Sequence, residues 1–327
     1  MMMKRFFSIL LLAVSVALFG GCIRDGSAPE EDEELFVIGF SQSGSESDWR
    51  LANTDSMIDT FTEEKGYELV VENAMQQQDN QIAAVRSFIL EGVDLIVLAP
   101  AMEEGWDTVL NEVYDAGIPV IIMDRSVNVG NHNLFLSNVG SDFLGQGNKA
   151  IEWLEEQTAG EDLKILHLQG TYGTTAQLLR SQALEEGVAG HDNWELAGQI
   201  CGDFTEAKGY EIMTEFLTET TDFNVLYSEN DNMTFGALRA LDEAGITYGE
   251  GGQVKIITFD ATSDALQLCY DGKIDLCVEC NPLQGPSVED LICRYRDGED
   301  IPKQVFIEEA LFTKDDLTQE IIDGRTY

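Results

Sequence analysis

The chain has 327 residues, of which 60 are Asp or Glu and 19 are Lys or Arg, so its formal net charge at pH 7 is −41. Apolar residues make up 44% of the sequence, which is enough for packed cores in two ordinary domains and excludes a disordered chain. The charge also excludes a nucleic-acid-binding protein, because such proteins draw most of their affinity from Lys and Arg. It favours solubility in a salty medium, with attraction to a basic partner as the alternative.

The first 21 residues have the layout of a secretory signal peptide. A short basic start precedes a nearly unbroken apolar run over 6–19, which is short for a permanent membrane span. Two glycines then precede Cys22, as in bacterial lipoprotein signals, so we expect lipid on Cys22 and removal of residues 1–21. The alternative is a soluble secreted protein. Residues 22–34 are acidic without an apolar period, which predicts a solvated tether.

After the tether, continuous apolar runs are separated by stretches with a helical apolar period. Such runs are typical of strands that are buried on both faces of a parallel sheet. In the first half they predict strands over 35–42, 67–72, 93–99 and 118–123. Apolar stripes predict one helix from Leu51, Met57, Ile58 and Phe61 through Lys65, a second over 82–89 and a third over 106–113.

The same alternation starts again after a seam near 138–141. We expect strands over 163–168, 196–200, 224–228, 254–259 and 274–280, with helices over 175–187 and 207–217. Strands that alternate with helices form βαβ units and a parallel sheet covered on both faces. The sequence therefore predicts an α/β fold with two similar Rossmann-like parallel-sheet lobes.

Polar and aromatic side chains follow the expected strands at the points where the strands end. In open parallel sheets, ligands bind beyond the carboxyl ends of the strands. The candidate binding residues are therefore Gln42, Glu46, Trp49, Arg50, Asp124, Arg125, Thr171, Arg180, Phe204, Asn230 and Asp260.

These candidates combine carboxylates, guanidinium groups and amides with an indole and a phenyl ring. The polar groups suit the vicinal hydroxyls of a sugar, and aromatic rings cover its apolar faces. Plainer interpretations exist: Asp124 and Arg125 as a surface ion pair, Arg180 as a solvated helix residue, and Trp49 and Phe204 as core residues. The shared position at one edge of two sheets favours a binding site.

An enzyme is the competing class of protein. The sequence contains no nucleophile elbow, no phosphate-binding loop and no nicotinamide-binding glycine pattern after the first strand. We therefore expect no catalytic residue and no cofactor. A glycosidase is a minor alternative, because a strand-end Asp and Glu could act as its acid pair.

Five cysteines follow Cys22, namely Cys201, Cys269, Cys277, Cys280 and Cys293. Some of them could pair in an oxidising compartment, but an odd number leaves at least one free or intermolecular. The Cys277–Cys280 spacing is only half of a metal-binding motif and falls at the end of an expected strand. We therefore expect no metal site.

Several motifs spread over 36–327 resemble one family. The most informative are Ser45-Glu46-Ser47-Asp48-Trp49-Arg50, Asp124-Arg125-Ser126, Gly202-Asp203-Phe204-Thr205 and Asn230-Asp231-Asn232-Met233. With these motifs the chain resembles the ribose-binding-protein-like family, the type I periplasmic sugar-binding proteins of ABC importers, and within it the galactofuranose-binding members.

The resemblance implies two lobes, over 35–139 plus 281–309 and over 140–280 plus 310–327, joined by a three-crossing hinge that closes on a sugar. It implies that the sugar hydroxyls are bound by Asp124, Arg125, Arg180, Asn230 and Asp260. It also implies that Trp49 and Phe204 face the sugar ring, and that Glu46 and Arg50 recognise the remaining parts of the sugar. It further implies a monosaccharide ligand, an ABC-transporter permease as partner, and a monomer that is held outside the cytoplasm, in the periplasm or on the cell surface, by its lipid alone.

Two departures from the family pattern bear on which sugar the protein binds. Cys280 stands where ribose binders tend to have a ligand Gln, and Ala261 stands where Gly is usual. The resemblance thus favours galactofuranose or galactose, with ribose, arabinose or another pentose or hexose as alternatives. A sugar sensor that serves a membrane receptor is a further alternative. A sugar-responsive repressor is excluded, because a signal sequence and acidic tether replace its basic DNA-binding segment.

Overall fold

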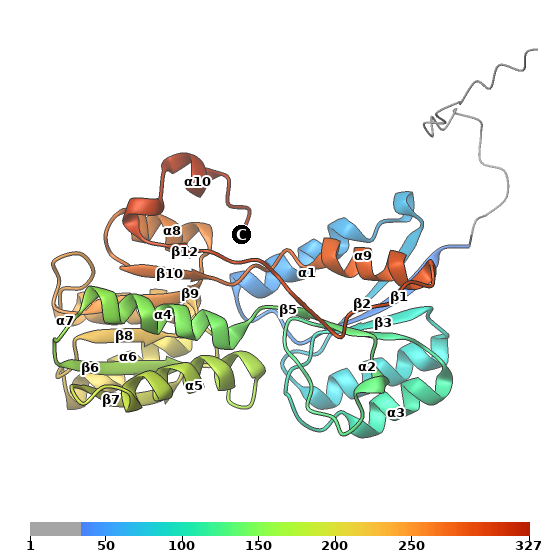
Figure 1. The fold of residues 1–327 in the computed structure, drawn as a ribbon, viewed down its shortest axis with the longest axis horizontal. Helices are drawn as coiled ribbons and strands as arrows, with labels where there is room; N and C mark the ends of the chain where they lie inside the picture. Colours follow the sequence, from blue (N-terminus) through green and yellow to red (C-terminus); the bar gives the residue numbers. More distant parts are fainter. Residues whose placement is uncertain (1–33) are drawn as a thin grey trace, which may run out of the picture. The chain divides into compact units, whose positions relative to one another are not determined.

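The computed structural model describes residues 34–327. The expected signal peptide, the lipidation site Cys22 and all but the last residue of the tether lie outside this range. Figure 1 shows two layered α/β lobes within the described part, each built around one sheet.

The sheet of the first lobe, here called the N-terminal lobe, has six parallel strands in the order β11-β5-β4-β3-β1-β2. Its strands are β1 (Phe36–Gln42), β2 (Tyr67–Asn73), β3 (Leu95–Leu98), β4 (Val120–Met123), β5 (Ser137–Gly140) and β11 (Gln304–Phe306). Strands β3 and β4 are buried along their whole length, which explains their continuous rather than alternating apolar pattern.

The sheet of the second, C-terminal lobe has the order β12-β10-β9-β8-β6-β7, parallel except for the antiparallel edge strand β12. Its strands are β6 (Leu163–Gln169), β7 (Trp194–Cys201), β8 (Val225–Ser228), β9 (Lys255–Asp260), β10 (Leu276–Glu279) and β12 (Leu311–Phe312). The predicted α/β class and the alternation in two halves are confirmed.

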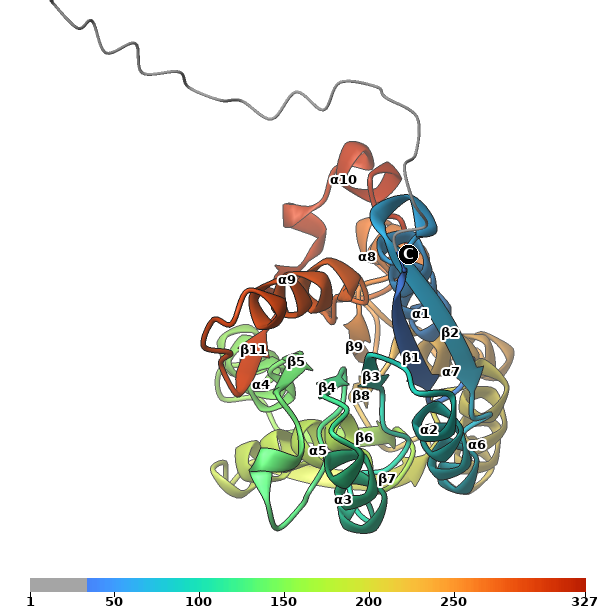
Figure 2. The ribbon, with the colours of Figure 1, turned by 90° about the vertical axis from the view of Figure 1, so that its right-hand side faces the viewer.

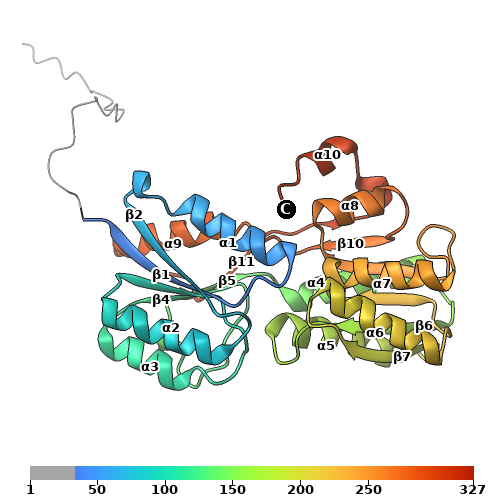
Figure 3. The same ribbon diagram turned by 180° about the vertical axis from the view of Figure 1, so that it is seen from behind.

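Helices cover both faces of each sheet, so each lobe has two apolar layers (Figures 2 and 3). On the N-terminal lobe, one face carries α1 (Asp48–Thr60) and α9 (Gly285–Arg296), and the other carries α2 (Gln78–Glu91) and α3 (Asp107–Ala116). On the C-terminal lobe, one face carries α4 (Phe143–Gln157) and α5 (Thr175–Ala189), and the other carries α6 (Glu206–Glu219), α7 (Asp231–Ala244) and α8 (Ser263–Tyr270). A short helix α10 (Gln319–Asp323) packs against α8.

The predicted apolar stripe of the first helix is confirmed at Met57 and Phe61, which are buried, and wrong at Leu51 and Ile58. Leu51 and Ile58 are 49% and 47% exposed, whereas the opposite, largely polar side of α1 is buried. This side faces the hinge, where Asn53 Nδ2 donates a hydrogen bond to the carbonyl of Pro282 (3.0 Å) and Ser56 Oγ accepts one from the first amide of α9 (3.0 Å). The helix also ends at Thr60, and a separate 3₁₀ turn follows.

The sequence prediction missed three strands. Residues around Asn138 were expected only as a seam, yet β5 pairs with β4 and β11 although Val139 is its only large apolar side chain. Strands β11 and β12 are three and two residues long, too short to produce a recognisable pattern.

The chain passes between the lobes three times, and these crossings are visible in Figure 1. The first crossing joins β5 to α4, the second joins β10 to α9, and the third joins β11 to β12. The exact limits of the two domains stay a prediction.

Candidate functional site

A cavity lies between the lobes, at the carboxyl ends of the strands. The N-terminal lobe contributes the loop after β1, the start of α1 and the residues after β4. The C-terminal lobe contributes α4, α5 and the segments after β7, β8, β9 and β10. The lining residues are Glu46, Ser47, Trp49, Arg50, Asp124, Arg125, Phe143, Ala176, Arg180, Phe204, Asn230, Asp260 and Cys280.

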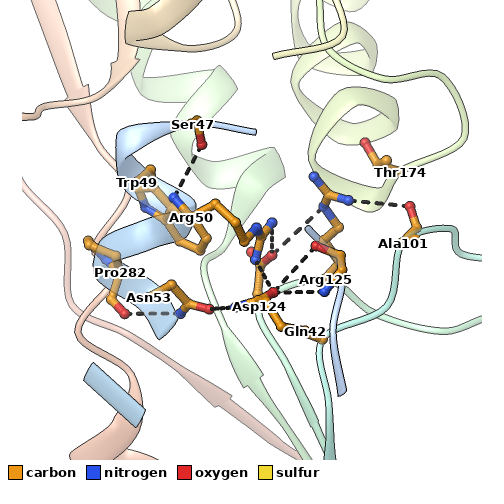
Figure 4. Close-up of polar contacts among 12 residues, drawn as sticks. Gln42, Ser47, Trp49, Arg50, Asn53, Ala101, Asp124, Arg125, Thr174 and Pro282 are labelled. Atoms are coloured by element: carbon orange, nitrogen blue, oxygen red, sulfur yellow. Dashed lines mark hydrogen bonds and ion pairs between the residues drawn. The ribbon is translucent and has the colours of Figure 1, made fainter. Parts of the chain in front are cut away.

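Four charged side chains of the N-terminal lobe form a buried ion network in this wall. Figure 4 labels three of them, Arg50, Asp124 and Arg125. Arg50 Nη2 lies 2.7 Å from Asp124 Oδ2, and Arg50 Nε lies 3.2 Å from Glu46 Oε1. Arg125 lies farther away, 3.7 Å from Glu46 and 3.8 Å from Asp124. Two cations and two anions thus compensate one another, as burial in a low-dielectric wall requires.

The network also controls protonation. Burial by itself raises the pKa of Glu46, but the neighbouring Arg50 and Arg125 outweigh burial and hold this pKa below its ordinary value. Glu46 therefore remains an anion at neutral pH. Its second oxygen, Oε2, is buried and has no hydrogen-bond partner among residues 34–327, so it is a free acceptor in the cavity wall.

The local sequence explains how Arg50 reaches this position. Ser47 caps α1 by accepting a hydrogen bond from the Arg50 amide (3.2 Å), which starts the helix directly behind the loop. Gln42 at the end of β1 accepts from Arg50 Nη1 (3.3 Å) and donates to Asn53 (3.0 Å). Asp124 adopts a left-handed backbone (φ 66°), a conformation that Asp tolerates better than most residues.

Arg180 is the main cation of the C-terminal lobe. It is 2% exposed, and its guanidinium lies over the rings of Phe143 (5.3 Å) and Phe259 (4.6 Å). Its Nε and Nη2 donate to Gln146 Oε1 (3.0 and 2.8 Å), and Nη1 donates to the Glu229 carbonyl (2.5 Å). Burial by itself lowers the pKa of Arg180, but the nearby Cys280, Asp260 and Glu229 outweigh burial and raise this pKa above its ordinary value. The Arg180 side chain therefore stays charged. We therefore regard Arg180 as a fixed, preorganised donor.

Three further C-terminal-lobe residues close the cavity. Phe204 has a left-handed backbone (φ 60°), and the Arg125 guanidinium of the other lobe lies 5.5 Å from its ring centre. Asn230 caps α7 through its side-chain oxygen (3.0 Å to Met233 N) and donates to the Phe204 carbonyl (3.1 Å). Burial and the nearby Asp231 raise the pKa of Asp260 well above its ordinary value, so Asp260 binds a proton readily.

Direct contacts join the lobes around the cavity. Trp49 Nε1 donates to the Cys280 carbonyl (2.6 Å), and the indole packs into the apolar cluster of the C-terminal lobe. On one rim, Asn232 Nδ2 donates to Asp48 Oδ2 (3.0 Å). On the other rim, the Ser126 amide donates to Thr175 Oγ1 (3.0 Å). The lobes are therefore closed over the cavity.

The model of the family described as "Periplasmic binding protein domain" matches residues 38–299. The chain belongs to this family. The galactofuranose-binding protein YtfQ of Escherichia coli (strain K12) is 34% identical over 289 residues, which cover 87% of this chain and 90% of YtfQ. This relative is a binding protein, and family membership likewise places the chain among binding proteins rather than enzymes.

Solved structures show the same architecture. A crystal structure of a galactofuranose binding protein superposes with a TM-score of 0.84 at 33% identity, covering 89% of this chain and 98% of that one. A Mycobacterium smegmatis protein in complex with β-D-fucofuranose superposes with a TM-score of 0.81 at 38% identity, covering 86% and 92%. The fold is that of type I periplasmic binding proteins, as predicted.

The structure of this periplasmic binding protein brings nine of the predicted site residues into the cavity wall. They are Glu46, Trp49, Arg50, Asp124, Arg125, Arg180, Phe204, Asn230 and Asp260. Gln42 lies one layer behind, where it orients Arg50. Thr171 is not in the wall, and its carbonyl accepts a hydrogen bond from Thr174.

The core interpretation of the aromatic candidates is confirmed, and their role in ligand binding stays a prediction. Trp49 and Phe204 belong to the apolar cluster of the C-terminal lobe and also line the cavity. Asp124 and Arg125 are 4% and 6% exposed, and Arg180 is equally enclosed, so the surface interpretations of these three are wrong.

The sequence prediction missed four lining residues: Ser47, Phe143, Ala176 and Cys280. Ser47 and Cys280 could have been found, because Ser47 lies inside the Glu46–Arg50 motif and Cys280 directly follows a strand. Phe143 and Ala176 start helices α4 and α5, and only knowledge of β5 and of the lobe contact would have pointed to them.

Two further properties concern residues 34–327. Among them, no three His, Cys, Asp or Glu side chains are grouped to hold a metal ion, and all five cysteines are free. None of their helices combines the length and apolar character that a membrane crossing requires.

Proposed function

We propose that this protein is a lipid-anchored solute-binding protein that captures a neutral monosaccharide, with galactofuranose or a galactose-type sugar favoured, for an ABC importer. The observation that carries the proposal is the charge pattern of the cavity. Three guanidinium groups, from Arg50, Arg125 and Arg180, meet three carboxyl groups, from Glu46, Asp124 and Asp260.

This pattern suits a neutral ligand with many hydroxyls. Glu46 and Asp124 already face Arg50 and Arg125, so these four groups leave no free counter-ion for an added ligand charge, which would also pay a desolvation cost. A sugar hydroxyl both donates and accepts, so it can donate to the free Oε2 of Glu46 and accept from guanidinium N–H groups. Trp49 and Phe204 supply flat apolar surfaces for the C–H groups of a sugar ring.

The relatives support the furanose form. The names of the similar proteins specify galactofuranose and β-D-fucofuranose, both five-membered rings. Cys280 in the cavity wall offers a thiol whose pKa is raised by burial, so at neutral pH it presents a weakly polar surface.

The proposed setting follows from the family and from the sequence before the described range. The family is that of periplasmic binding proteins, which supports a location outside the cytoplasm. The apolar run and Cys22 support a lipid anchor, with the acidic segment up to residue 34 as the tether. In this arrangement a monomer delivers the sugar to a membrane permease when the lobes are closed.

A thermal-unfolding screen tests the proposal. The purified protein is heated with D-galactose, L-arabinose, D-ribose, methyl β-D-galactofuranoside and methyl β-D-galactopyranoside, with D-galacturonate as the charged control. A ligand at 1,000 times its Kd stabilises by about 4 kcal/mol, which gives a clear shift of the midpoint. We expect a shift with at least one neutral sugar and none with galacturonate. A shift with galacturonate alone, or with none of the sugars after refolding from denaturant, would refute the proposal.

A further inference from the structure

A single carboxylate links all three crossings of the hinge. Glu309 lies on the third crossing, after β11. Its Oε1 accepts hydrogen bonds from Ser141 Oγ on the first crossing (2.5 Å) and from the Asn281 amide on the second crossing (2.9 Å). Figure 1 shows these three segments running together between the lobes.

The same carboxylate is linked to the cavity. Glu309 Oε2 accepts from Gln146 Nε2 of α4 (2.6 Å), and Gln146 Oε1 accepts from Nε and Nη2 of Arg180 (3.0 and 2.8 Å). Arg180 lines the cavity. A continuous chain of hydrogen bonds therefore runs from the cavity wall, through one amide side chain, to the hinge.

The second and third crossings are also fixed beside Glu309. The Ala310 amide donates to Glu279 Oε2 (2.8 Å), and the Glu279 amide donates to the Ala310 carbonyl (2.9 Å). Gln146 Nε2 donates in addition to the Glu279 carbonyl (3.1 Å). The Glu309 carboxylate thus completes a compact polar cluster, and it is the member that reaches the first crossing.

An ionised carboxylate is well suited to this position, because it accepts through both oxygens and needs no donor of its own. All three of its partners donate. A glutamine of the same shape would accept with one oxygen and place an NH₂ group where Glu309 now accepts. If that NH₂ group faced Gln146 Nε2, two donors would oppose each other.

We propose, building on the proposed sugar-binding function, that Glu309 is a positioning residue that couples the engagement of Arg180 by the ligand to closure of the hinge. The carboxylate holds the three crossings in the register of the closed state. Gln146 transmits the position of Arg180 to that carboxylate. Weakening the link shifts the protein towards the open state and lowers sugar affinity, although Glu309 lines no part of the cavity.

The test compares four variants with the wild-type protein: Glu309→Gln, Gln146→Glu, the double variant and Glu308→Gln. The double variant reverses donor and acceptor between positions 146 and 309, because the carboxylate at 146 can accept from the amide at 309 and from Arg180, but it gives up the donation from position 146 to the Glu279 carbonyl. Glu308 is the matched control, since it is the adjacent exposed glutamate and makes no side-chain hydrogen bond within residues 34–327. Ser141→Ala is a milder variant that keeps the test valid if Glu309→Gln does not fold.

Two quantities are measured: the Kd of the best sugar from the panel by calorimetry, and the radius of gyration without ligand by X-ray scattering. We expect Glu309→Gln to raise Kd at least tenfold and to expand the ligand-free protein, and Glu308→Gln to stay within twofold. The double variant should bind sugar more tightly than Glu309→Gln and so recover part of the loss, which a merely structural defect would not allow. Unchanged affinity and scattering in Glu309→Gln, or no recovery in the double variant, would overturn the inference.

Scattering also separates this inference from the function it rests on. If the wild-type protein binds no sugar, the proposed function fails. An expanded ligand-free Glu309→Gln protein would then still support the hinge role of Glu309, and unchanged scattering would refute it.

Discussion

Asp124→Asn should destabilise the protein strongly although it changes only one side-chain atom. Asp124 is 4% exposed, and its Oδ2 lies 2.7 Å from Arg50 Nη2 and 3.8 Å from Arg125 Nε. Asparagine keeps the shape and tolerates the left-handed backbone, so the substitution removes mainly the charge. It leaves two buried guanidinium groups with Glu46 as their only anion in this network.

Breaking a buried ion pair by removing one partner costs about 3–5 kcal/mol, and the remaining Glu46 places the expectation at the low end, about 3 kcal/mol. The unfolding midpoint falls by about 2–4 °C per kcal/mol in domains of about 150–250 residues, so we expect a decrease of roughly 6–12 °C. Sugar affinity should fall as well, because Arg50 and Arg125 lose their orientation.

Chemical and thermal unfolding, followed by circular dichroism, measure this effect. Asp59→Asn is the matched control, because Asp59 is an exposed carboxylate on α1 and the substitution changes the net charge equally. The control should stay within about 0.5 kcal/mol of the wild type. If Asp124→Asn is no less stable than Asp59→Asn, the ion network does not support the cavity wall as described.

Three further predictions concern the aromatic contact, pH and salt. Trp49→Phe removes the hydrogen bond to the Cys280 carbonyl and should weaken sugar binding about 2- to 10-fold, equivalent to about 0.5–1.5 kcal/mol; calorimetry that shows tighter or equal binding would contradict this. Burial raises the pKa of Asp231 from 3.8 to about 6, so the folded state binds the Asp231 proton more tightly than the unfolded state does. The contribution of Asp231 to the free energy of unfolding therefore increases as the pH falls from about 6 towards 3.8. Unfolding between pH 7 and 5 should therefore show a steeper stability gain in the wild type than in Asp231→Asn, and equal slopes would disprove the assignment. Because the net charge is −41, raising NaCl from about 0.05 to 1 M should raise the unfolding midpoint by screening self-repulsion, and a falling midpoint would contradict this expectation.

The fold could be read from the sequence because its strands are buried on both faces. Continuous apolar runs such as Leu95–Leu98 and Val120–Met123 each follow a helix that is capped by a glycine with a left-handed backbone, Gly92 or Gly117. Prediction failed where tertiary contacts override the local pattern. The polar side of α1 is buried because hinge segments distant in the sequence supply its hydrogen bonds, and no local pattern reveals this.

Much of the cavity wall was predictable for a similar reason. Residues that follow parallel strands gather at one edge, so Asp124, Arg125 and Asp260 could be named from strand ends alone. Thr171 also follows a strand but stays outside the wall, because position after a strand does not determine where a side chain points. Glu309 could not be found, because its role depends on three crossings that only the folded chain brings together.

Isothermal titration with the panel of neutral sugars, on protein freed of carried-over ligand by unfolding and refolding, tests the proposed function most directly. We predict that one of them binds with a stoichiometry of one per chain, and that Asp124→Asn weakens this binding while Asp59→Asn does not. Absence of binding heat for every neutral sugar, or a sugar affinity that Asp124→Asn leaves unchanged, would contradict the assignment of this cavity as a monosaccharide site.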